Sequence, residues 1–158
     1  MAIYYGCDIP EELYYHPEYD VWVRFEEDDT ATLGMVDVAQ TAAGKLLYLQ
    51  FKPVGKKIKT GGSAATIESS KWVGPFRMPF DVEILANNLE TFTEDVLSAN
   101  KDPYGRGWLV KVRVLQPDTA RDHLLTRVEA VRHYQKRIDE HNIRCFRCVD
   151  DAAPMQSE

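Results

Sequence analysis

The sequence predicts a mainly β fold, a sandwich or barrel of short strands followed by one amphipathic α-helix. The first observation is that runs of β-branched and aromatic residues recur between glycine, proline and polar turns as far as residue 115, which is typical of β-sandwiches and barrels. The second is a change of period after Pro117, where apolar residues recur at gaps of three and four and indicate one face of a helix. The residues with this spacing are Leu125, Val128, Val131, Tyr134 and Ile138.

Length and composition fit one globular domain. The 158 residues are 44% hydrophobic and 28% charged, so the chain can bury a sizeable core. The formal net charge of −6 gives no electrostatic reason to expect a nucleic-acid partner. No apolar run is long enough to cross a bilayer, and residues 1–10 contain Asp8 and lack the basic region of a signal peptide. We therefore expect a cytoplasmic protein with no membrane or nucleic-acid partner.

Four segments are expected in chain order. Residues 1–16 form an arm packed on the core, and residues 17–115 form the main β domain. Residues 116–144 form the C-terminal helix, with Asp118 as its N-cap. Residues 145–158 form a tail, of which residues 150–158 have little apolar surface to bury and are expected to be loose.

Within the β domain, strands are expected wherever β-branched and aromatic residues cluster. These strands are residues 21–25, 30–35, 46–51, 80–85 and 108–114. A short helix is expected over residues 38–43, with Asp37 as its cap and Gly44 just after its last turn. Residues 87–97 are expected to form a helical or turn segment.

The most informative local pattern lies in the middle of the chain. Residues 64–67 and 72–73 are short β-prone runs, and the link between them, residues 68–71, is polar. This pattern predicts a tight hairpin with Lys71 at or near its tip. A lysine at a hairpin tip is ordinarily only a solvated surface residue, so its meaning depends on the surrounding motifs.

Three motifs, in the same order along the chain, resemble the glycine-cleavage H-protein family. E-S-S-K at residues 68–71 is similar to the family's lipoylation motif E-S-V-K. Residues 21–40 contain V-W-V-R, D-T-A-T-L-G-M and D-V-A-Q, similar to the family's E-W-V-R, D-T-A-T-V-G-I and D-x-A-Q. D-P-Y-G-R-G-W-L at residues 102–109 is similar to its D-P-Y-G-x-G-W-L. The resemblance covers roughly residues 14–114.

This resemblance implies a hybrid fold of the lipoyl/biotinyl type, also described as a barrel-sandwich or hammerhead. It implies a carrier that catalyses nothing itself and presents a lipoyl arm, joined by an amide to Lys71, at high effective concentration to partner enzymes. The implied partners are a lipoate ligase or lipoyl transferase and dihydrolipoamide dehydrogenase. Glu68 matches the acidic residue that the family uses for ligase recognition. No catalytic or metal-binding residue is implied.

Two alternatives concern the residues that flank Lys71. Trp72 stands where the family typically has a small residue, and it either packs the hairpin or serves as a ledge for the apolar arm. Biotin is the other cofactor carried on a lysine. Biotin domains place that lysine between two methionines, whereas Ser70 and Trp72 stand here, so biotin is disfavoured.

The chain departs from the family at the residue before Trp22. H-proteins have an acid there, which helps to hold the amine of an aminomethyl-loaded arm, and this chain has Val21. Asp20 is the nearest carboxylate and could compensate from one residue away. If Asp20 belonged to the same strand, its side chain would point to the opposite face. We therefore expect a cargo other than the aminomethyl group.

A narrower resemblance concerns G-C-D-I-P-E-E-L-Y-Y-H at residues 6–16 and E-S-S-K-W-V-G-P at residues 68–75. Both are similar to the lipoate-binding proteins of bacterial sulfur oxidation, which work with a cytoplasmic heterodisulfide-reductase-like complex. It implies an arm that carries sulfur or electrons, and we expect this role in preference to glycine cleavage with its aminomethyl cargo. The alternative to a cofactor carrier is a binding module that has the same fold but is never modified.

The cysteines Cys7, Cys145 and Cys148 are odd in number and too few for a disulfide framework, in keeping with a reducing compartment. The C-x-x-C at residues 145–148 follows a helix and does not open one, so it is not thioredoxin-like. A structural zinc site needs four ligands, and only His141 is close in sequence. We expect Cys145 and Cys148 to be incidental thiols and Cys7 to be a buried cysteine of the N-terminal segment. A redox role for the three cysteines near the lipoyl arm stays open.

Overall fold

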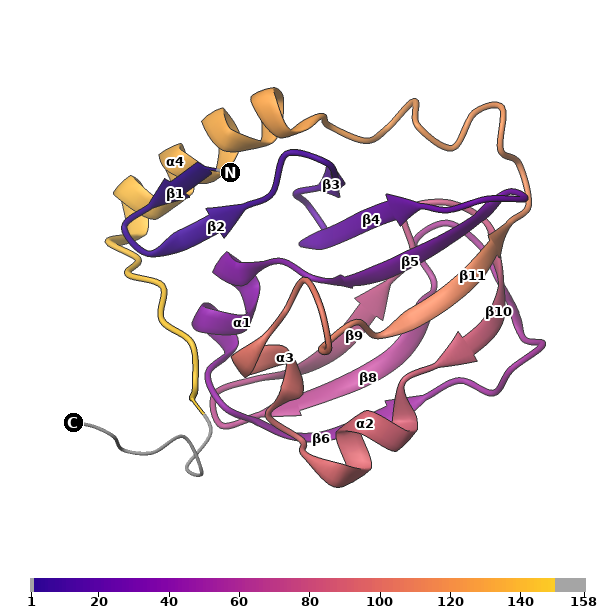
Figure 1. Cartoon of the computed structure of the whole chain (residues 1–158), viewed down its shortest axis with the longest axis horizontal. Helices are drawn as coiled ribbons and strands as arrows, with labels where there is room; N and C mark the ends of the chain where they lie inside the picture. Colours follow the sequence, from indigo (N-terminus) through magenta and orange to yellow (C-terminus); the bar gives the residue numbers. More distant parts are fainter. Residues whose placement is uncertain (1, 150–158) are drawn as a thin grey trace.

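The computed structural model describes residues 2–149 and contains two β-sheets that face each other, an N-terminal hairpin and a long C-terminal helix (Figure 1). The larger sheet is a six-stranded antiparallel sheet. Its strands in spatial order are β3 (Tyr14–His16), β4 (Val21–Phe25), β5 (Thr30–Met35), β11 (Val110–Val114), β10 (Val82–Asn87) and β7 (Lys57–Ile58).

The smaller sheet has three antiparallel strands in the order β6, β8, β9. They are β6 (Leu46–Phe51), β8 (Ser63–Ser69) and β9 (Val73–Arg77). Side chains alternate between the two faces of each strand, and the inward residues of both sheets, such as Leu33, Val112, Ile67 and Phe76, form one buried apolar cluster. The predicted mainly β fold is therefore confirmed, and the strands expected at residues 21–25, 30–35 and 46–51 have the expected bounds.

Two predicted strands begin later than expected. β10 begins at Val82 and not at residue 80, because Asp81 is engaged in a turn, where its Oδ1 accepts a hydrogen bond from the backbone N–H of Thr60 at 2.8 Å. β11 begins at Val110 and not at residue 108. The segment expected to be helical or turn-like contains α2 (Leu89–Glu94), and α3 (Ser98–Lys101) follows it.

Two of the sequence motifs meet at one end of the larger sheet. The indole N–H of Trp22, which is fully buried, donates a hydrogen bond to the carbonyl of Pro103 at 2.9 Å. Arg24 Nη2 donates to the carbonyl of Tyr104 at 3.0 Å. The loop that contains residues 102–109 is thus fastened to β4, which explains why these distant motifs occur together.

The helix α1 (Asp37–Ala43) begins one residue earlier than expected. Val36 is its N-cap, and Asp37 is its first residue, so the assignment of Asp37 as the cap is wrong. The carboxylate of Asp37 is fully buried and accepts hydrogen bonds from the backbone N–H of Asp8 at 2.9 Å and from Gln40 Nε2 at 2.7 Å. Gly44 ends the helix at a positive φ of 79°, as predicted.

The C-terminal helix α4 (Arg127–His141) is confirmed, but its N-cap is Thr126 and not Asp118. Thr126 and Glu129 form a capping box, in which Glu129 Oε1 accepts the backbone N–H of Thr126 at 3.0 Å. Leu125 exchanges backbone hydrogen bonds with Tyr15 at 2.8 and 2.9 Å, so the helix cannot start before that residue. Because β-pairing holds the chain there, the predicted start was too early.

The N-terminal arm contains a hairpin of β1 (Ala2–Tyr4) and β2 (Cys7–Ile9), which lies between α1 and α4 (Figure 1). Its buried residues join a second apolar cluster with Trp22 and with Tyr134 and Ile138 of α4. The last residues of the arm, in β3, pair with β4 and are part of the larger sheet.

Cys7 and Cys145 form a disulfide across a sequence separation of 138 residues, and Cys148 is free. The expectation that Cys145 is an incidental thiol is therefore wrong, whereas Cys7 is buried in the N-terminal arm, as expected. A single bond between distant segments needs no framework of several pairs, and sequence spacing does not reveal it. The pairing also removes the cysteine-based argument for a reducing compartment. In the described part of the tail, residues 145–149, backbone hydrogen bonds from Cys145 and Cys148 fasten the chain to the body. Residues 150–158, which were expected to be loose, lie outside the described residues.

Among residues 2–149, no helix has the length and apolar character that crossing a membrane requires.

Candidate functional site

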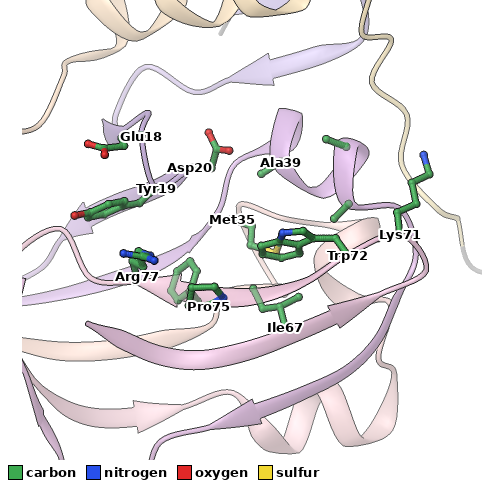
Figure 2. A pocket seen from close by; sticks show the side chains of 13 residues that line it. Glu18, Tyr19, Asp20, Met35, Ala39, Ile67, Lys71, Trp72, Pro75 and Arg77 are labelled. Atoms are coloured by element: carbon green, nitrogen blue, oxygen red, sulfur yellow. The ribbon is translucent and has the colours of Figure 1, made fainter. Parts of the chain in front are cut away.

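Lys71 lies at the tip of the hairpin between β8 and β9, as predicted. The backbone N–H of Ser69 donates to the carbonyl of Trp72 at 2.8 Å and closes a tight turn, in which Ser70 and Lys71 are the exposed central residues. Ser69 Oγ accepts the backbone N–H of Lys71 at 3.3 Å and donates to the carbonyl of Trp72 at 3.2 Å. The amine of Lys71 points away from the body of the protein (Figure 2).

The tip rests on the link between α1 and β6. The backbone N–H of Ser70 donates to the carbonyl of Lys45 at 3.0 Å. Gly44 has a φ of +79°, and a Cβ placed on it would lie 2.7 Å from Ser70 Oγ and 3.6 Å from Lys71 Cε. Glycine is therefore needed here both for the backbone conformation and for the close approach of the hairpin tip.

A buried asparagine from α3 holds that link in place. Asn100 is 2% exposed, and its Oδ1 accepts the backbone N–H of Leu46 at 2.9 Å. Its Nδ2 donates to the carbonyl of Gly44 at 2.9 Å and to Gln40 Oε1 at 3.1 Å. Asn100 was not among the residues predicted for the site. The sequence offers only one indication of a role for Asn100, which is that it lies shortly before the D-P-Y-G motif.

A cavity of about 720 Å³ opens beside the hairpin tip. Figure 2 shows the side chains that line it, with Lys71 at one end and Glu18, Tyr19 and Asp20 at the other. The apolar lining comes from Met35, Ile67 and Phe76 and from the alanines of α1, which are Ala39, Ala42 and Ala43. The charged residues of the lining are Lys71, Glu18, Asp20 and Arg77.

Trp72 contributes its indole to this cavity and is 43% exposed. Figure 2 shows the indole among the side chains that line the cavity. The indole covers Gly74 so closely that any Cβ on that residue would overlap the ring. Both roles considered for Trp72 are therefore compatible with its position, since it packs the hairpin through Gly74 and offers its other surface to the cavity.

Asp20 lines the same cavity, contrary to the expectation from strand alternation. That expectation is wrong because Asp20 has a φ of +57° and lies in a turn, and β4 begins only at Val21. Its Oδ1 accepts hydrogen bonds from Arg137 Nη1 at 2.7 Å and from the Tyr134 hydroxyl at 3.1 Å. Burial raises the pKa of Asp20 above its usual value, and the Arg137 guanidinium opposes that shift.

Val21 and Glu68 lie outside the cavity. Val21 is fully buried in the apolar cluster between the sheets and cannot contact a cargo. Glu68 is exposed on the outer face of β8, where it pairs across the sheet with Tyr48 and Val73. Because side chains alternate along β8, Glu68 points outward while its neighbour Ile67 lines the cavity.

The three cysteines are not brought into the cavity. None of Cys7, Cys145 and Cys148 is among its lining residues. Among the predicted site residues, the structure therefore joins Lys71 and Trp72 at the cavity, leaves Glu68 on the adjoining surface, and places the cysteines elsewhere.

Comparison with known proteins agrees with this architecture. The profile of the family described as "Glycine cleavage H-protein" matches residues 13–138. A solved structure, the glycine cleavage system H protein of Mycobacterium marinum, superposes with a TM-score of 0.70 at 29% sequence identity and covers 80% of this chain and 99% of that one.

Curated relatives are similar over nearly the whole chain. Glycine cleavage system H protein 3 of Aquifex aeolicus (strain VF5) is 45% identical over 149 residues, which is 92% of each chain. H protein 2 of the same organism is 37% identical over 142 residues, 90% of this chain and 88% of that one. The "Probable glycine cleavage system H protein 2" of Sulfolobus acidocaldarius is 36% identical over 149 residues and covers 93% and 99% of the two chains.

Proposed function

Because this chain belongs to the glycine cleavage H-protein family, we propose that it carries a lipoyl group on Lys71. Members of that family are non-catalytic lipoyl carriers, so the chain is a cofactor-bearing carrier and not an enzyme. The observation that carries the assignment to Lys71 is its position at the exposed tip of a closed turn, directly beside the cavity. A modifying enzyme reaches an amine there without unfolding any strand.

The residues around Lys71 fit such a group. Amide formation removes the charge of the lysine and adds a long apolar chain, and the cavity offers an apolar lining that starts at Lys71. Met35, Ile67 and the indole of Trp72 would cover the apolar chain and exclude water from it. When bound, the lipoyl group supplies a dithiolane that undergoes thiol–disulfide exchange or holds a group on sulfur.

Glu68 supports recognition by the enzyme that attaches the group, a lipoate ligase or lipoyl transferase. Its carboxylate is exposed, three residues before Lys71, on a face of the hairpin that does not line the cavity. An enzyme can therefore contact Glu68 and the Lys71 amine together while the cavity stays free. Dihydrolipoamide dehydrogenase, which acts on lipoyl dithiols, is a further partner in this proposal.

The names of the relatives favour glycine cleavage, with an aminomethyl cargo and the glycine cleavage enzymes as partners, over the sulfur role expected from residues 6–16. Two carboxylates support a cationic cargo. Asp20 and Glu18 line the half of the cavity that is remote from Lys71, which the cationic Arg77 also lines. A charged amine on the end of an arm would need a counter-charge there.

One observation favours the second candidate, transfer of sulfur or electrons to a heterodisulfide-reductase-like complex. The carboxylate of Asp20 is already bound by Arg137 and Tyr134, and Val21, at the family's acidic position, is buried in the core. A cationic cargo would compete with Arg137 for Asp20. A neutral or anionic sulfur cargo has no such requirement.

The proposal on Lys71 is tested by supplying the unmodified protein with a lipoate ligase, ATP and lipoate. We expect one lipoyl group per chain by intact mass and none on Lys71→Arg. Lys45→Arg is the matched control, because Lys45 is also exposed and adjoins the same turn, and it should be modified like the wild type. Equal labelling of Lys71→Arg, or no labelling of the wild type, would contradict the proposal and favour an unmodified binding module.

The cargo is tested with lipoylated protein in glycine–bicarbonate exchange by the glycine cleavage enzymes. If the cargo is aminomethyl, the wild type supports exchange, and Asp20→Asn slows it about tenfold, equivalent to about 1.4 kcal/mol of lost stabilisation. The exchange rate of Glu18→Gln measures how much the second carboxylate contributes to stabilising the cationic cargo. Weak exchange that Asp20→Asn leaves unchanged, together with uptake of sulfane sulfur by the arm, would instead support the sulfur role.

A further inference from the structure

The described end of the chain fastens α1 to the N-terminal hairpin. Residues 145–148, here called the C-terminal strap, leave the end of α4 and pass along α1 (Figure 1). The backbone N–H of Cys145 donates to the carbonyl of Tyr5 at 3.0 Å. The carbonyl of Phe146 accepts hydrogen bonds from Gln40 Nε2 at 2.9 Å and from Thr41 Oγ1 at 3.3 Å.

The strap also supplies the counter-charge for a buried carboxylate. Asp37 is fully buried, and Arg147 Nη2 lies 3.3 Å from its Oδ2 and 3.7 Å from Oδ2 of Asp8. A buried carboxylate that loses its partner is strongly disfavoured. The strap therefore contacts α1 at two places. Arg147 neutralises Asp37 at the N-terminus of the helix, and the carbonyl of Phe146 binds the side chains of Gln40 and Thr41.

The far end of the strap reaches the support of the Lys71 turn. The backbone N–H of Cys148 donates to the carbonyl of Asn100 at 3.0 Å. Asn100 is the buried residue whose side chain holds Gly44, against which the turn is packed. Hydrogen bonds thus connect the strap through Asn100 to Gly44, on which the Lys71 turn is packed.

The two cysteines of the disulfide that secures the strap differ in their exposure to solvent. Cys7 is fully buried in the second apolar cluster, whereas Cys145 is partly exposed. Exchange depends on which sulfur a thiolate can reach. A nucleophile from solvent therefore meets Cys145, and the Cys7 sulfur is the leaving group.

We propose that the Cys7–Cys145 disulfide is a thiol–disulfide exchange site that takes a dithiol as its substrate through Cys145, and that its reduction releases the C-terminal strap. Cys148 is held at α3 while Cys145 is held at the N-terminal hairpin, so Cys148 is not required for the first attack.

The exchange conserves atoms and electrons in two steps. One thiolate of the dithiol attacks Cys145 Sγ, the bond between Cys145 and Cys7 breaks, and the Cys7 sulfur takes a proton. The second thiol of the substrate then attacks the sulfur bound to Cys145 and closes a cyclic disulfide, and Cys145 leaves as a thiol. The substrate loses two electrons and two protons, and the protein disulfide gains them.

The preference for a dithiol has a physical reason. The second thiol resolves the mixed disulfide intramolecularly, at high effective concentration, whereas a monothiol must wait for a second molecule. A dihydrolipoyl arm is a dithiol of this kind. That link rests on the proposed function, so the test uses Lys71→Arg, which carries no arm and reports the disulfide site alone.

Oxidised Lys71→Arg protein is incubated under native conditions with free dihydrolipoamide or with an equal thiol concentration of 2-mercaptoethanol, then alkylated and mapped. We expect Cys7 and Cys145 to become alkylated at least tenfold faster with the dithiol, and 2-mercaptoethanol to be trapped on Cys145 and not on Cys7. Cys148→Ser in the same background should react at the same rate. A disulfide that resists dihydrolipoamide until denaturant is added, an adduct on Cys7, or loss of the reaction in Cys148→Ser would overturn the proposal.

Release of the strap is read separately by hydrogen exchange of the same protein before and after reduction. We expect faster exchange at the backbone amides of Cys145 and Cys148, and a smaller increase at Ser70 in the Lys71 turn. Unchanged protection at Cys145 and Cys148 after complete reduction would overturn the release of the strap, whatever the outcome of lipoylation at Lys71.

Discussion

At the scale of single residues, the position of Lys71 depends on a glycine that lies in another part of the sequence. Gly44 adopts a positive φ at the end of α1 and leaves room for Ser70 and for the aliphatic stem of Lys71. Asn100 then fixes the carbonyl of Gly44 from α3. The proposed modification site is therefore defined by three segments, although its motif lies in only one of them.

Gly44→Ala should destabilise the protein and slow lipoylation of Lys71. Positive φ disfavours alanine, and the new Cβ would meet Ser70 Oγ, so we expect a loss of about 1–3 kcal/mol in the free energy of unfolding. Urea denaturation measures the stability, and the rate of lipoyl transfer measures the site.

Gly55→Ala is the matched control for this substitution. Gly55 has a φ of +92°, but a Cβ added to it would have no other atom within 4 Å, so it shares the backbone strain without the contact. It should lose less stability and be lipoylated at the wild-type rate. Equal effects of the two substitutions on lipoylation would show that Gly44 does not position the turn.

At the scale of elements, contacts between distant segments determine where a helix or strand begins and which side chains it places at the cavity. The loop with D-P-Y-G is fastened to β4 through Trp22 and Arg24. Leu125 pairs with Tyr15 and delays the start of α4. Because α4 then carries Arg137 to Asp20, the helix also sets the electrostatics at the remote end of the cavity.

Thr126→Ala should lower the free energy of unfolding by about 1 kcal/mol, because it removes the N-cap side chain of α4. Urea denaturation followed by circular dichroism measures this loss. Asp118→Ala is the control, since Asp118 is the cap that the sequence predicted, and it should change stability by less than about 0.5 kcal/mol. A larger loss in Asp118→Ala than in Thr126→Ala would contradict the observed capping box.

At the scale of the whole molecule, the features that follow from local patterns were predictable. Runs of β-branched and aromatic residues predicted most strands of the two sheets, although not the short strands β3 and β7, and the polar link after residue 67 predicted the hairpin that presents Lys71. The general reason is that these signals depend only on neighbours in sequence.

The features that depend on distant segments were not predictable in this way. Asp20 reaches the cavity because it adopts a positive φ before β4, and an aspartate gives no sign of that conformation in a single sequence. The pairing of Cys7 with Cys145 spans almost the whole chain. Asn100 supports the Lys71 turn from α3, and its role is visible only once the two segments are adjacent.

The central claim is that Lys71 carries a lipoyl group, and it is tested most directly on protein purified from its native host. Intact mass spectrometry followed by peptide mapping should show one lipoyl amide per chain, on the peptide that contains Lys71. Lys45, which is exposed beside the same turn, should be unmodified in that protein. An intact mass equal to that of the bare chain, or a lipoyl group on a lysine other than Lys71, would contradict the account.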